Sequence, residues 1–564
     1  MNRALEELSA RYERANLDEH GPLAAGGFTA FYRANQGLPV SRIVPESESA
    51  NQAAAAFYRD LLAQLDGVED ERLDNVDRTS YLVLRSAIER YLAETRYYWY
   101  GSAVTPYRSM LFLLRMVFQS FEVATEEGQQ RYFSVVRDAA ACADAAREKL
   151  AGQLRRGIVL PKRAMPQIVA LHRSAAKIEN SPFLPGAQHL AALDPAARER
   201  FVRKAYETIE RSVTPAMTRL VAFLEHEYQP AATDAAGQSA YPGGADYYAH
   251  RVRMETTLDQ PAEQIHAQGL AIVAQLRESM EQLRDRANID PKAFVPSRPQ
   301  QIGEKLERFA RLADAAMTPF FRRKPAAPFG VKRLPDDLAG GMAFGYYQPG
   351  AARGETGYYL YNGSNLPQRS LLSAAAFAVH ELLPGHHYEI NMARENESLP
   401  RFRAFQSIAT YVAAYHEGWA EYAADLGHEL GIYEDPVDRY GRYALDAFVS
   451  SRLVVDTGVN ALGWSFERAE RYMRENTLLS DAEIHSEVLR YATDLPGQGL
   501  AYKTGSLTFR RLRDKARAAL GAAFDVREFH DRIVCAGGMP LPLVEREIDE
   551  FISEGGNTRG ALRR

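Results

Sequence analysis

Cysteine is almost absent from this sequence of 564 residues, which contains only Cys142 and Cys535. The two are far apart and neither belongs to a C-x-x-C pair, so we expect two buried free thiols, as in a reducing compartment. Long apolar runs are absent as well, because no window approaches the ~18 apolar residues that a membrane-spanning helix needs. The N-terminal segment 1–7 is charged and lacks the apolar core of a signal peptide. The expected location is therefore cytoplasmic.

A strong charge of either sign is also missing. The formal net charge is −5, and no long block of lysine and arginine stands out. This weak balance argues against a nucleic-acid partner, and the lack of apolar runs argues against a membrane partner. Hydrophobic residues make up 46% of the chain and charged residues 25%, which are the values of a globular protein with a large core.

Most of the chain has the periodicity of amphipathic helices, so the predicted fold class is mainly α. We expect a helical N-terminal region, 1–290, and a region that carries the chemistry, 291–564, folded together as one compact unit. Segment 197–228 shows the pattern clearly, and we expect a kink at Pro215. Its apolar residues, at spacings of three and four, predict a buried stripe: Phe201, Ala205, Ile209, Val213, Met217, Leu220 and Leu224. A second such helix is predicted after Pro261.

Proline and glycine become frequent between residues 291 and 367, and the residues between them favour strands. Three short strands are predicted, at 330–334, 342–347 and 357–362. We expect them to form a small antiparallel sheet that precedes the metal-binding helix described next.

The third predicted strand contains three candidate substrate-binding residues, Tyr359, Tyr361 and Asn362. It ends shortly before a helix that we expect to begin near Ser370. The strand could therefore offer an edge on which an extended peptide adds as a further strand. A hairpin whose tyrosines only pack explains the same pattern, and both interpretations stay open.

The segment V-H-E-L-L-P-G-H-H, residues 379–387, carries the clearest chemical signal. In an H-E-x-x-H zinc helix the two histidines are four residues apart on one face. His380 and His386 are six apart, which is about 9 Å along an ideal helix and too far for one ion. If Pro384 and Gly385 loop out, H-E-L-L-H remains. We therefore predict a metal helix with a two-residue bulge.

His387 is the alternative second ligand, because a separation of seven residues restores the same helical face. The distance along the axis would then be about 10 Å, which is again too long for chelation. We prefer His386 as the ligand and expect His387 to support the site by hydrogen bonding.

Two histidines leave a tetrahedral zinc ion short of one protein ligand. A second helix, predicted at 407–430, contains H-E-G-W-A-E-Y, in which Glu417 and Glu421 are four residues apart on one face. One of the two glutamates could bind the metal while the other accepts the free N–H of a ligand imidazole. A solvated acidic face is the alternative interpretation of this pair.

These motifs resemble the bacterial family labelled domain of unknown function 885, which is similar to zinc metallopeptidases of the gluzincin type. The family patterns H-E-x-x-P-G-H-H and E-G-W-x-x-Y are matched at 380–387 and 417–422, and P-G-Q-x-x-x-Y-K-x-G at 496–505. An F-H-D element with a G-x-x-P-L tail is matched at 529–541. The resemblance implies a large helical fold, a central channel covered by the N-terminal region, and a Zn²⁺ cofactor.

The sequence departs from the family pattern at two positions. Where the family has D-T-G-x-H, this chain has D-T-G-V-N, from Asp456 to Asn460, and Glu389 stands where a glutamine is often found. If the usual histidine donates to a reacting oxygen, the Asn460 amide could donate in its place without a charge. Asp456 is expected to support the site.

The resemblance and the ligand chemistry together imply that Glu417 is the third metal ligand and that Glu421 accepts the N–H of a ligand imidazole. They also imply roles for four further residues. Glu381 would act as general base toward water. Tyr502 would donate to the oxyanion of the tetrahedral intermediate. Gln498 and Lys503 are candidate substrate-binding residues, and Lys503 would anchor a substrate carboxylate. A buried aromatic residue and an ordinary surface lysine are the alternative interpretations of Tyr502 and Lys503.

The expected function is zinc-dependent hydrolysis of short peptides, which are the expected partner, with carboxypeptidase-like cleavage as one form. Two alternatives stay open. The chain could be a non-catalytic homologue that binds metal or peptide, which the departure at Asn460 favours. It could also be an amide hydrolase that uses the same site on a small non-peptide metabolite.

Overall fold

The computed structural model describes residues 2–69, 73–107, 109–335, 344–405 and 410–557. It is mainly helical with one small sheet, as the sequence predicts. The helices that precede the sheet are α1 (Arg3–Leu17), α2 (Phe28–Asn35), α3 (Glu48–Leu65), α4 (Asn75–Glu94), α5 (Met110–Gln119), α6 (Glu126–Arg155), α7 (Met165–Ala175), α8 (Ala187–Ala191), α9 (Pro195–Phe223), α10 (Gln229–Ala231), α11 (Gly244–Thr256), α12 (Ala262–Ala287) and α13 (Pro299–Ala316).

The remaining elements contain the sheet and the predicted metal-binding residues. They are β1 (Phe329–Arg333), β2 (Gly345–Gln348), β3 (Gly357–Tyr361), α15 (Ala374–Glu381), α16 (His386–Glu395), α17 (Arg401–Ala404), α18 (Ala413–Leu426), α19 (Pro436–Asn460), α20 (Phe466–Asn476), α21 (Asp481–Leu489), α22 (Leu500–Leu520), α23 (Val526–Val534) and α24 (Leu541–Ser553).

The two long helices predicted in the N-terminal region are present. Helix α9 contains Pro215 and continues into a π-helical turn, Leu224–Tyr228. Every residue of its predicted apolar stripe is buried. Helix α12 begins directly after Pro261, whose fixed φ suits that position.

The sheet is mixed, so the predicted antiparallel arrangement is wrong for one of its two pairs. The strand order is β1-β3-β2, with β2 antiparallel and β1 parallel to the central strand β3. Local alternation of residues gives the position of a strand but not the direction of its partner, because either pairing uses the same pleat. The second predicted strand begins at residue 342, and 342–343 lie outside the described residues.

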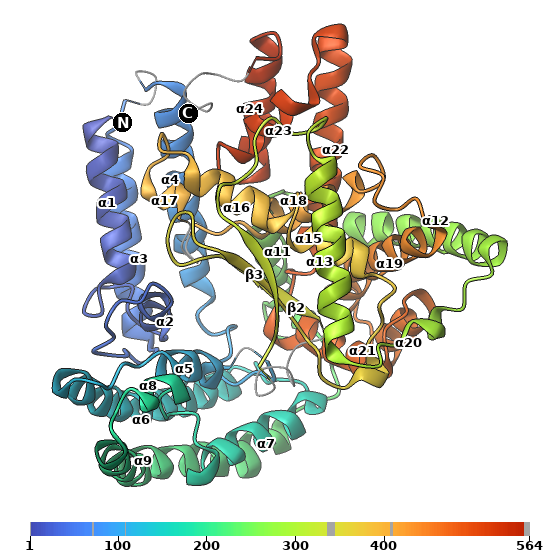
Figure 1. Cartoon of the computed structure of the whole chain (residues 1–564). Coiled ribbons are helices and arrows are strands. Elements are labelled where there is room, and N and C mark those ends of the chain that lie inside the picture. The colour runs from blue at the N-terminus through green and yellow to red at the C-terminus, as the bar shows by residue number, and fades with distance from the viewer. Residues whose placement is uncertain (1, 70–72, 108, 336–343, 406–409, 558–564) are drawn as a thin grey trace.

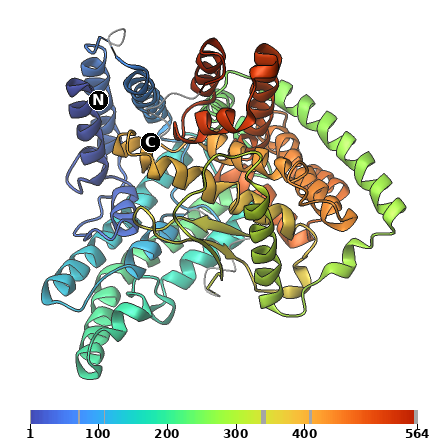
Figure 2. The same cartoon turned by 45° about the horizontal axis from the view of Figure 1, so that its top comes forward.

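Figures 1 and 2 show the sheet and helix α13 in front of the helices that carry the predicted ligands, α15, α16 and α18. Helices α1 to α4 lie on one side of this centre and α5 to α9 form a layer below it. Helices α22 to α24 lie at the opposite end from that layer.

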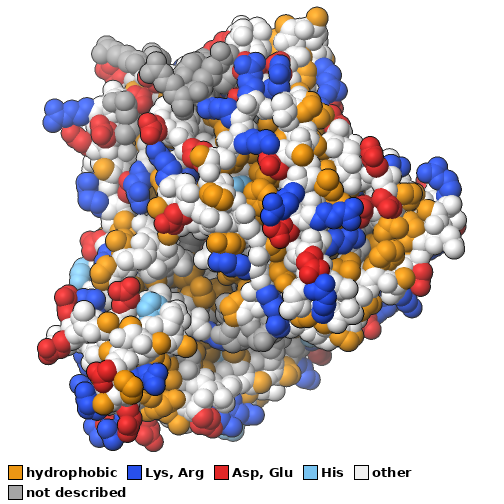
Figure 3. Space-filling model, viewed as in Figure 1, with side chains coloured by type: hydrophobic (Ala, Val, Ile, Leu, Met, Phe, Trp, Pro, Cys, Tyr) orange, Lys and Arg blue, Asp and Glu red, His pale blue; other side chains and the backbone are white. Residues whose placement is uncertain are grey.

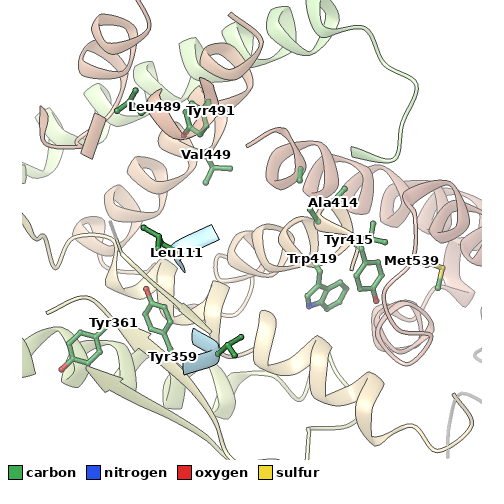
Figure 4. Packing of buried hydrophobic residues seen from close by; sticks show 14 of the residues in the cluster. Leu111, Tyr359, Tyr361, Ala414, Tyr415, Trp419, Val449, Leu489, Tyr491 and Met539 are labelled. Carbon is green, nitrogen blue, oxygen red and sulfur yellow. The ribbon is translucent and has the colours of Figure 1, made fainter. Parts of the chain in front are cut away.

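One large cluster of buried hydrophobic side chains joins the two regions, from Leu5 in α1 to Phe551 in α24. Within it, Tyr415 and Trp419 project from the same side of α18, as Figure 4 shows. Cys142 and Cys535 are free and buried, as predicted. The division at residue 290 stays a prediction.

Helices α18 and α22 approach each other through two glycines. A Cβ atom at Gly418 would lie 2.5 Å from the Cα of Gly505, and a Cβ at Gly505 would overlap the carbonyl oxygen of Ala414. Only glycine permits this backbone contact, which brings the helix of Glu417 against the helix of Tyr502.

In the part of the chain that the structure describes, no helix combines the length and apolar character needed to cross a bilayer. The cytoplasmic location expected from the sequence stays a prediction.

Candidate metal centre

The two predicted histidine ligands lie on two separate helices. Helix α15 ends at Glu381, the backbone leaves helical geometry at Leu382 (φ −111°, ψ −94°), and α16 begins at His386. The prediction of one helix with a two-residue bulge is therefore wrong, because the chain changes direction between the histidines. A Cβ atom at Gly385 would overlap the carbonyl oxygen of His380, so the reversal requires glycine.

This reversal brings the imidazoles of His380 and His386 together, with ring centroids 5.0 Å apart and planes at 88°. Glu417 on α18 lies between them. Its Oε2 atom is 3.7 Å from His380 Nε2 and 3.3 Å from His386 Nε2, and ligand atoms of all three residues lie within 4.8 Å of one another.

These distances suit one small divalent ion. Zinc binds imidazole nitrogen and carboxylate oxygen at about 2.0–2.2 Å, so two donors of a tetrahedral site lie about 3.4 Å apart. The two histidine-to-glutamate separations fall on either side of that value. The residues therefore fit a tetrahedral ion with three protein donors and one open position.

A carboxylate lies behind each histidine. Glu421 Oε1 is 2.9 Å from His380 Nδ1, and the other Glu421 oxygen accepts a hydrogen bond from Arg442 at 3.0 Å. Glu389 Oε1 is 3.6 Å from His386 Nδ1 and 2.8 Å from His416 Nδ1. Both ligand rings thus turn Nε2 toward the common point, as an acceptor behind an imidazole ligand requires.

The charges of this cluster favour a cation. Burial opposes protonation of His380, but the neighbouring Glu417 and Glu421 carboxylates outweigh it and raise its pKa to about 9. Burial likewise opposes ionisation of Glu417, but His380 and His386 hold its pKa well below the ordinary value. The same negative potential that retains protons on the imidazoles would retain a divalent ion in their place.

Glu381, the predicted general base, is the last residue of α15 and lines the same cavity as the three donors. Burial raises its pKa, the two histidines oppose that rise, and Glu417 adds to it. A hydrogen bond from the backbone N–H of Tyr347 in β2 holds the carboxylate. A buried carboxyl with a raised pKa has the properties of a general base at neutral pH.

Tyr502 and Gln498 also line this cavity. The Tyr502 ring is stacked on the His380 ring at 6.3 Å and 15°, and Gln498 Nε2 donates to the Tyr502 hydroxyl at 3.4 Å. Burial, and then Glu417, raise the pKa of Tyr502, so it remains a phenol that can donate a hydrogen bond.

The cavity has a volume of about 1010 Å³ and is lined by both regions of the chain. Helices α5 and α7 contribute Phe112, Arg115 and Leu171. Figure 3 shows the surface hollowed between the α5–α9 layer and the sheet, with hydrophobic side chains in the hollow. A second cavity, of about 670 Å³, shares Tyr411 and two other lining residues with the first, so the two adjoin.

Comparison with known proteins agrees with the family suggested by the motifs. The family described as "Bacterial protein of unknown function (DUF885)" matches residues 32–548. The chain belongs to the DUF885 family. No curated protein matches it.

Two solved structures share the fold. One is a "putative lipoprotein" from Colwellia psychrerythraea, with a TM-score of 0.87 and 22% identity over 98% of this chain and 99% of that chain. The other is a "putative lipoprotein of unknown function" from Shewanella oneidensis, with a TM-score of 0.71 and 14% identity over 96% and 98% of the two chains.

The motif blocks that suggested DUF885 contact one another around the candidate metal centre. Trp419 Nε1 donates to the carbonyl oxygen of Pro384 at 2.9 Å, so the E-G-W element fixes the break between α15 and α16. The Tyr422 hydroxyl lies 2.7 Å from His530 Nε2, which joins the E-G-W helix to the F-H-D element. These motif residues hold helices in place and do not line the cavity.

Asn460 and Asp456 do not lie at the candidate site. Asn460 is fully buried, and its amide donates to Asp456 and to the carbonyl of Tyr491 while its oxygen accepts from Gln238 N–H. Asp456 accepts from Tyr248 and from Gly497 N–H. These hydrogen bonds fix the turn that precedes α22. Asn460 therefore has no access to a reacting oxygen, and Asp456 contacts no metal donor.

Lys503 lies behind the cavity wall rather than in the cavity. Its Nζ is 2.5 Å from Asp446 Oδ1, and its side chain is buried in the charged cluster around Arg442. A lysine on the face of α22 that packs into the core has no access to a substrate carboxylate. The predicted role of Lys503 as an anchor is wrong.

His387 supports α16 and is not a ligand. Its Nε2–H donates to the carbonyl of Ala327 at 3.0 Å, so the neutral ring accepts from the Tyr347 hydroxyl at Nδ1, at 2.9 Å. Burial lowers the pKa of His387 to about 4. His387 thus makes hydrogen bonds, as predicted, but they join α16 to the sheet and do not contact a candidate metal donor.

The three predicted substrate-binding residues in and directly after β3 do not line the cavity. Because β3 is the central strand, it has no free edge for a peptide. Tyr361 packs against Gly303 in α13, and Asn362 accepts hydrogen bonds from Ser364. The alternative interpretation, in which these side chains only support the fold, fits Tyr361 and Asn362. Tyr359 is buried near Glu381.

Sequence reasoning missed several residues at the centre. Glu389 was noted only as a departure from the family pattern, yet it lies behind His386. Tyr411 lines the cavity and its hydroxyl donates to Glu417 Oε1 at 3.4 Å. The cavity wall also contains Arg452 and Arg490. Only Glu389, at three residues after His386 on a helix, had a spacing that could have revealed it.

Proposed function

We propose that this protein is a zinc-dependent peptidase that hydrolyses short peptides, with Glu381 as general base. The likeness to gluzincin-type peptidases, drawn from the H-E and E-G-W motifs, belongs to this proposal. The same donor set suits zinc best among the common divalent ions, since it combines two imidazoles with one carboxylate.

One observation carries the proposal. His380, His386 and Glu417 turn their donor atoms toward one point at separations of 3.3 and 3.7 Å, and Glu381 lines the same cavity immediately beside them. A purely structural zinc site would be closed by four protein ligands, whereas three ligands facing a large cavity leave a position open.

The residues around this point have complementary chemical roles. A zinc ion held by the three donors would supply Lewis-acid chemistry, which polarises a carbonyl group and acidifies water. Glu381 accepts the proton of the attacking water and passes it to the leaving amine. Tyr502 donates a hydrogen bond to the carbonyl oxygen as negative charge develops there.

The decisive test combines metal analysis with hydrolysis of a mixed peptide library. Zinc-loaded protein should contain one ion per chain and release amino acids or short peptides. The variant Glu381→Gln should keep its zinc while its rate falls on the order of 10²–10⁴-fold, because only the base is lost. Glu545→Gln, on α24 outside the cavity, is the matched control and should behave as wild type.

Two outcomes would redirect the proposal. Zinc binding and ligand-induced thermal stabilisation without any turnover would favour a non-catalytic binding protein. The departure at Asn460 no longer favours that alternative, since the residue lies away from the centre. Turnover of small amides but of no peptide would favour a metabolite hydrolase.

A further inference from the structure

Two arginines lie side by side in the cavity wall next to Tyr502. Arg452 is on α19, and Arg490 begins the π-helical segment Arg490–Asp494 that follows α21. Both contact Glu487: Arg452 Nη2 is 3.1 Å from Oε2, and Arg490 Nη1 is 3.3 Å from Oε1. Short π-helical segments are frequent at functional sites, where they redirect a side chain.

This cluster of two arginines and Glu487 carries more positive than negative charge. Two guanidinium groups share the one carboxylate of Glu487, and their other partners are neutral. Arg452 Nε donates to the Tyr491 hydroxyl at 3.1 Å, and Arg490 Nη2 donates to Gln498 Oε1 at 2.7 Å. Asp494 also lines the cavity, but its oxygens accept from Tyr107 N–H and the Thr493 hydroxyl.

Each arginine retains donor capacity after these contacts. Among the described residues, Arg452 Nη1 and Arg490 Nε have no hydrogen-bond partner, and both side chains line the cavity. A guanidinium group has five N–H donors in a planar fork that matches a carboxylate. Two such groups beside one shared carboxylate have the positive charge and the unused N–H donors to bind a second anion.

The position of this pair relative to the metal centre is defined by Tyr502. The Tyr502 ring is 6.3 Å from the His380 ring, and the Arg452 guanidinium carbon is 4.6 Å from the centroid of the same Tyr502 ring. An extended peptide advances about 3.3–3.6 Å per residue. The two separations place the His380 ring within about 11 Å of the Arg452 guanidinium carbon. A metal–ligand bond of about 2 Å at one end and a hydrogen bond of about 3 Å at the other take up part of this distance. One or two residues therefore span the remainder, from a carbonyl group at the centre to a carboxylate at the arginines.

We propose that Arg452 and Arg490 bind the C-terminal carboxylate of the peptide substrate and so restrict cleavage to its last one or two peptide bonds. This inference rests on the proposed function and specifies its substrate class. It gives to the arginines the anchoring role that the sequence had suggested for Lys503.

The test uses one peptide library made in two forms, with free C-terminal carboxylates and with C-terminal carboxamides. Wild-type protein loaded with zinc should hydrolyse the carboxylate form about 10- to 100-fold more efficiently in kcat/KM, because a hydrogen-bonded charge is lost in the carboxamide. Arg490→Gln should lose most of this preference by slowing hydrolysis of the carboxylate form. Arg490→Lys, which keeps the charge, should retain part of it.

A matched control separates the anchor from a general effect of removing an arginine. Arg163 is also paired with glutamate, in its case with both Glu467 and Glu470, but it lies outside the cavity. Arg163→Gln should leave the preference for free carboxylates unchanged. A preference lost equally in Arg163→Gln and Arg490→Gln would overturn the proposal.

A binding measurement distinguishes failure of the anchor from failure of the peptidase proposal. The zinc-loaded Glu381→Gln protein is mixed with both libraries, and retained peptides are counted by mass spectrometry after ultrafiltration. Selective retention of carboxylate peptides, lost when Arg490→Gln is added, supports the anchor even if wild type shows no turnover. Equal retention of the two forms, or retention of neither, overturns the anchor even if wild type hydrolyses peptides.

Discussion

His386 and His387 are neighbours in the sequence but lie in opposite chemical environments. His386 faces Glu417 and Glu389, which raise its pKa well above the ordinary value against the effect of burial. His387 faces a carbonyl group and a hydroxyl group, and burial lowers its pKa to about 4. Around the metal centre the histidines have carboxylate partners, whereas at the sheet and at His530 they have neutral ones.

The difference shows that burial alone does not assign a role to a histidine. His387 and His530 are each satisfied by one acceptor and one donor, so both remain neutral and join elements of the fold. The ligand candidates instead have carboxylates near both ring nitrogens, which stabilises positive charge there, either as protons on the rings or as a metal ion between them. The partners, more than the residue type, separate a structural histidine from a metal ligand.

Replacing His386 and His387 in turn should produce the largest difference in zinc affinity. His386→Ala should weaken zinc binding by about 10³-fold, since a complete site of three or four ligands contributes about 10–16 kcal/mol. His387→Ala should leave zinc affinity nearly unchanged but lower the free energy of unfolding by about 1–3 kcal/mol, because Ala327 and Tyr347 lose a partner. Competition with a chromogenic chelator and urea unfolding measure the two effects. Similar zinc affinities in the two variants would contradict the assignment.

The two carboxylates behind the candidate ligands should differ in how much they contribute to zinc affinity. Glu421 is 2.9 Å from His380 and paired with Arg442, whereas Glu389 is 3.6 Å from His386 and shared with His416. Glu421→Gln should weaken zinc binding by about 10- to 100-fold. Glu389→Gln should weaken it by about tenfold or less, because Glu389 lies farther from its imidazole and is shared with His416. A larger loss for Glu389→Gln than for Glu421→Gln would reverse this order.

The neutral histidines should make the fold sensitive to acid. Burial lowers the pKa of His530 to about 3, so the unfolded chain binds more protons than the folded one as the pH falls below about 6.5. The stability contributed by each neutral histidine is thus complete above that pH and is lost below it, by about 2 kcal/mol between pH 7 and pH 5. Urea unfolding of zinc-free protein checks this.

The control for the acid effect is His530→Gln, which keeps one donor and one acceptor but cannot be protonated in this range. It should lower stability at pH 7 while reducing the loss between pH 7 and pH 5. An unchanged pH dependence in this variant would show that His530 is not responsible.

The side chains that meet at the candidate centre were predictable from the sequence, and its helix geometry was not. The spacing of Glu417 and Glu421 on one helical face correctly placed both carboxylates toward the histidines. The break after Glu381 could not be inferred, since Pro384 and Gly385 are compatible with either a bulge or a reversal. That choice depends on tertiary contacts, such as the hydrogen bond from Trp419 to Pro384.

The errors in predicting site residues from the sequence have a common cause. Asn460 and Lys503 lie on long helices whose other faces line or approach the cavity, and sequence position alone does not specify which face turns inward. Arg452 and Arg490 come from separate elements that meet only in the folded chain. The parallel pairing of β1 with β3 is likewise a long-range contact, which residue alternation cannot reveal.

The glycine contact between α18 and α22 determines how the distance between Glu417 and Tyr502 can vary. No side-chain layer separates the two helices at Gly418 and Gly505, so there is nothing between them to repack or compress. Substitutions elsewhere in the core can therefore shift the two helices together but cannot change their separation gradually. The spacing of the Glu417 carboxylate and the Tyr502 phenol is consequently an all-or-none property, retained while the backbones touch and lost when they part.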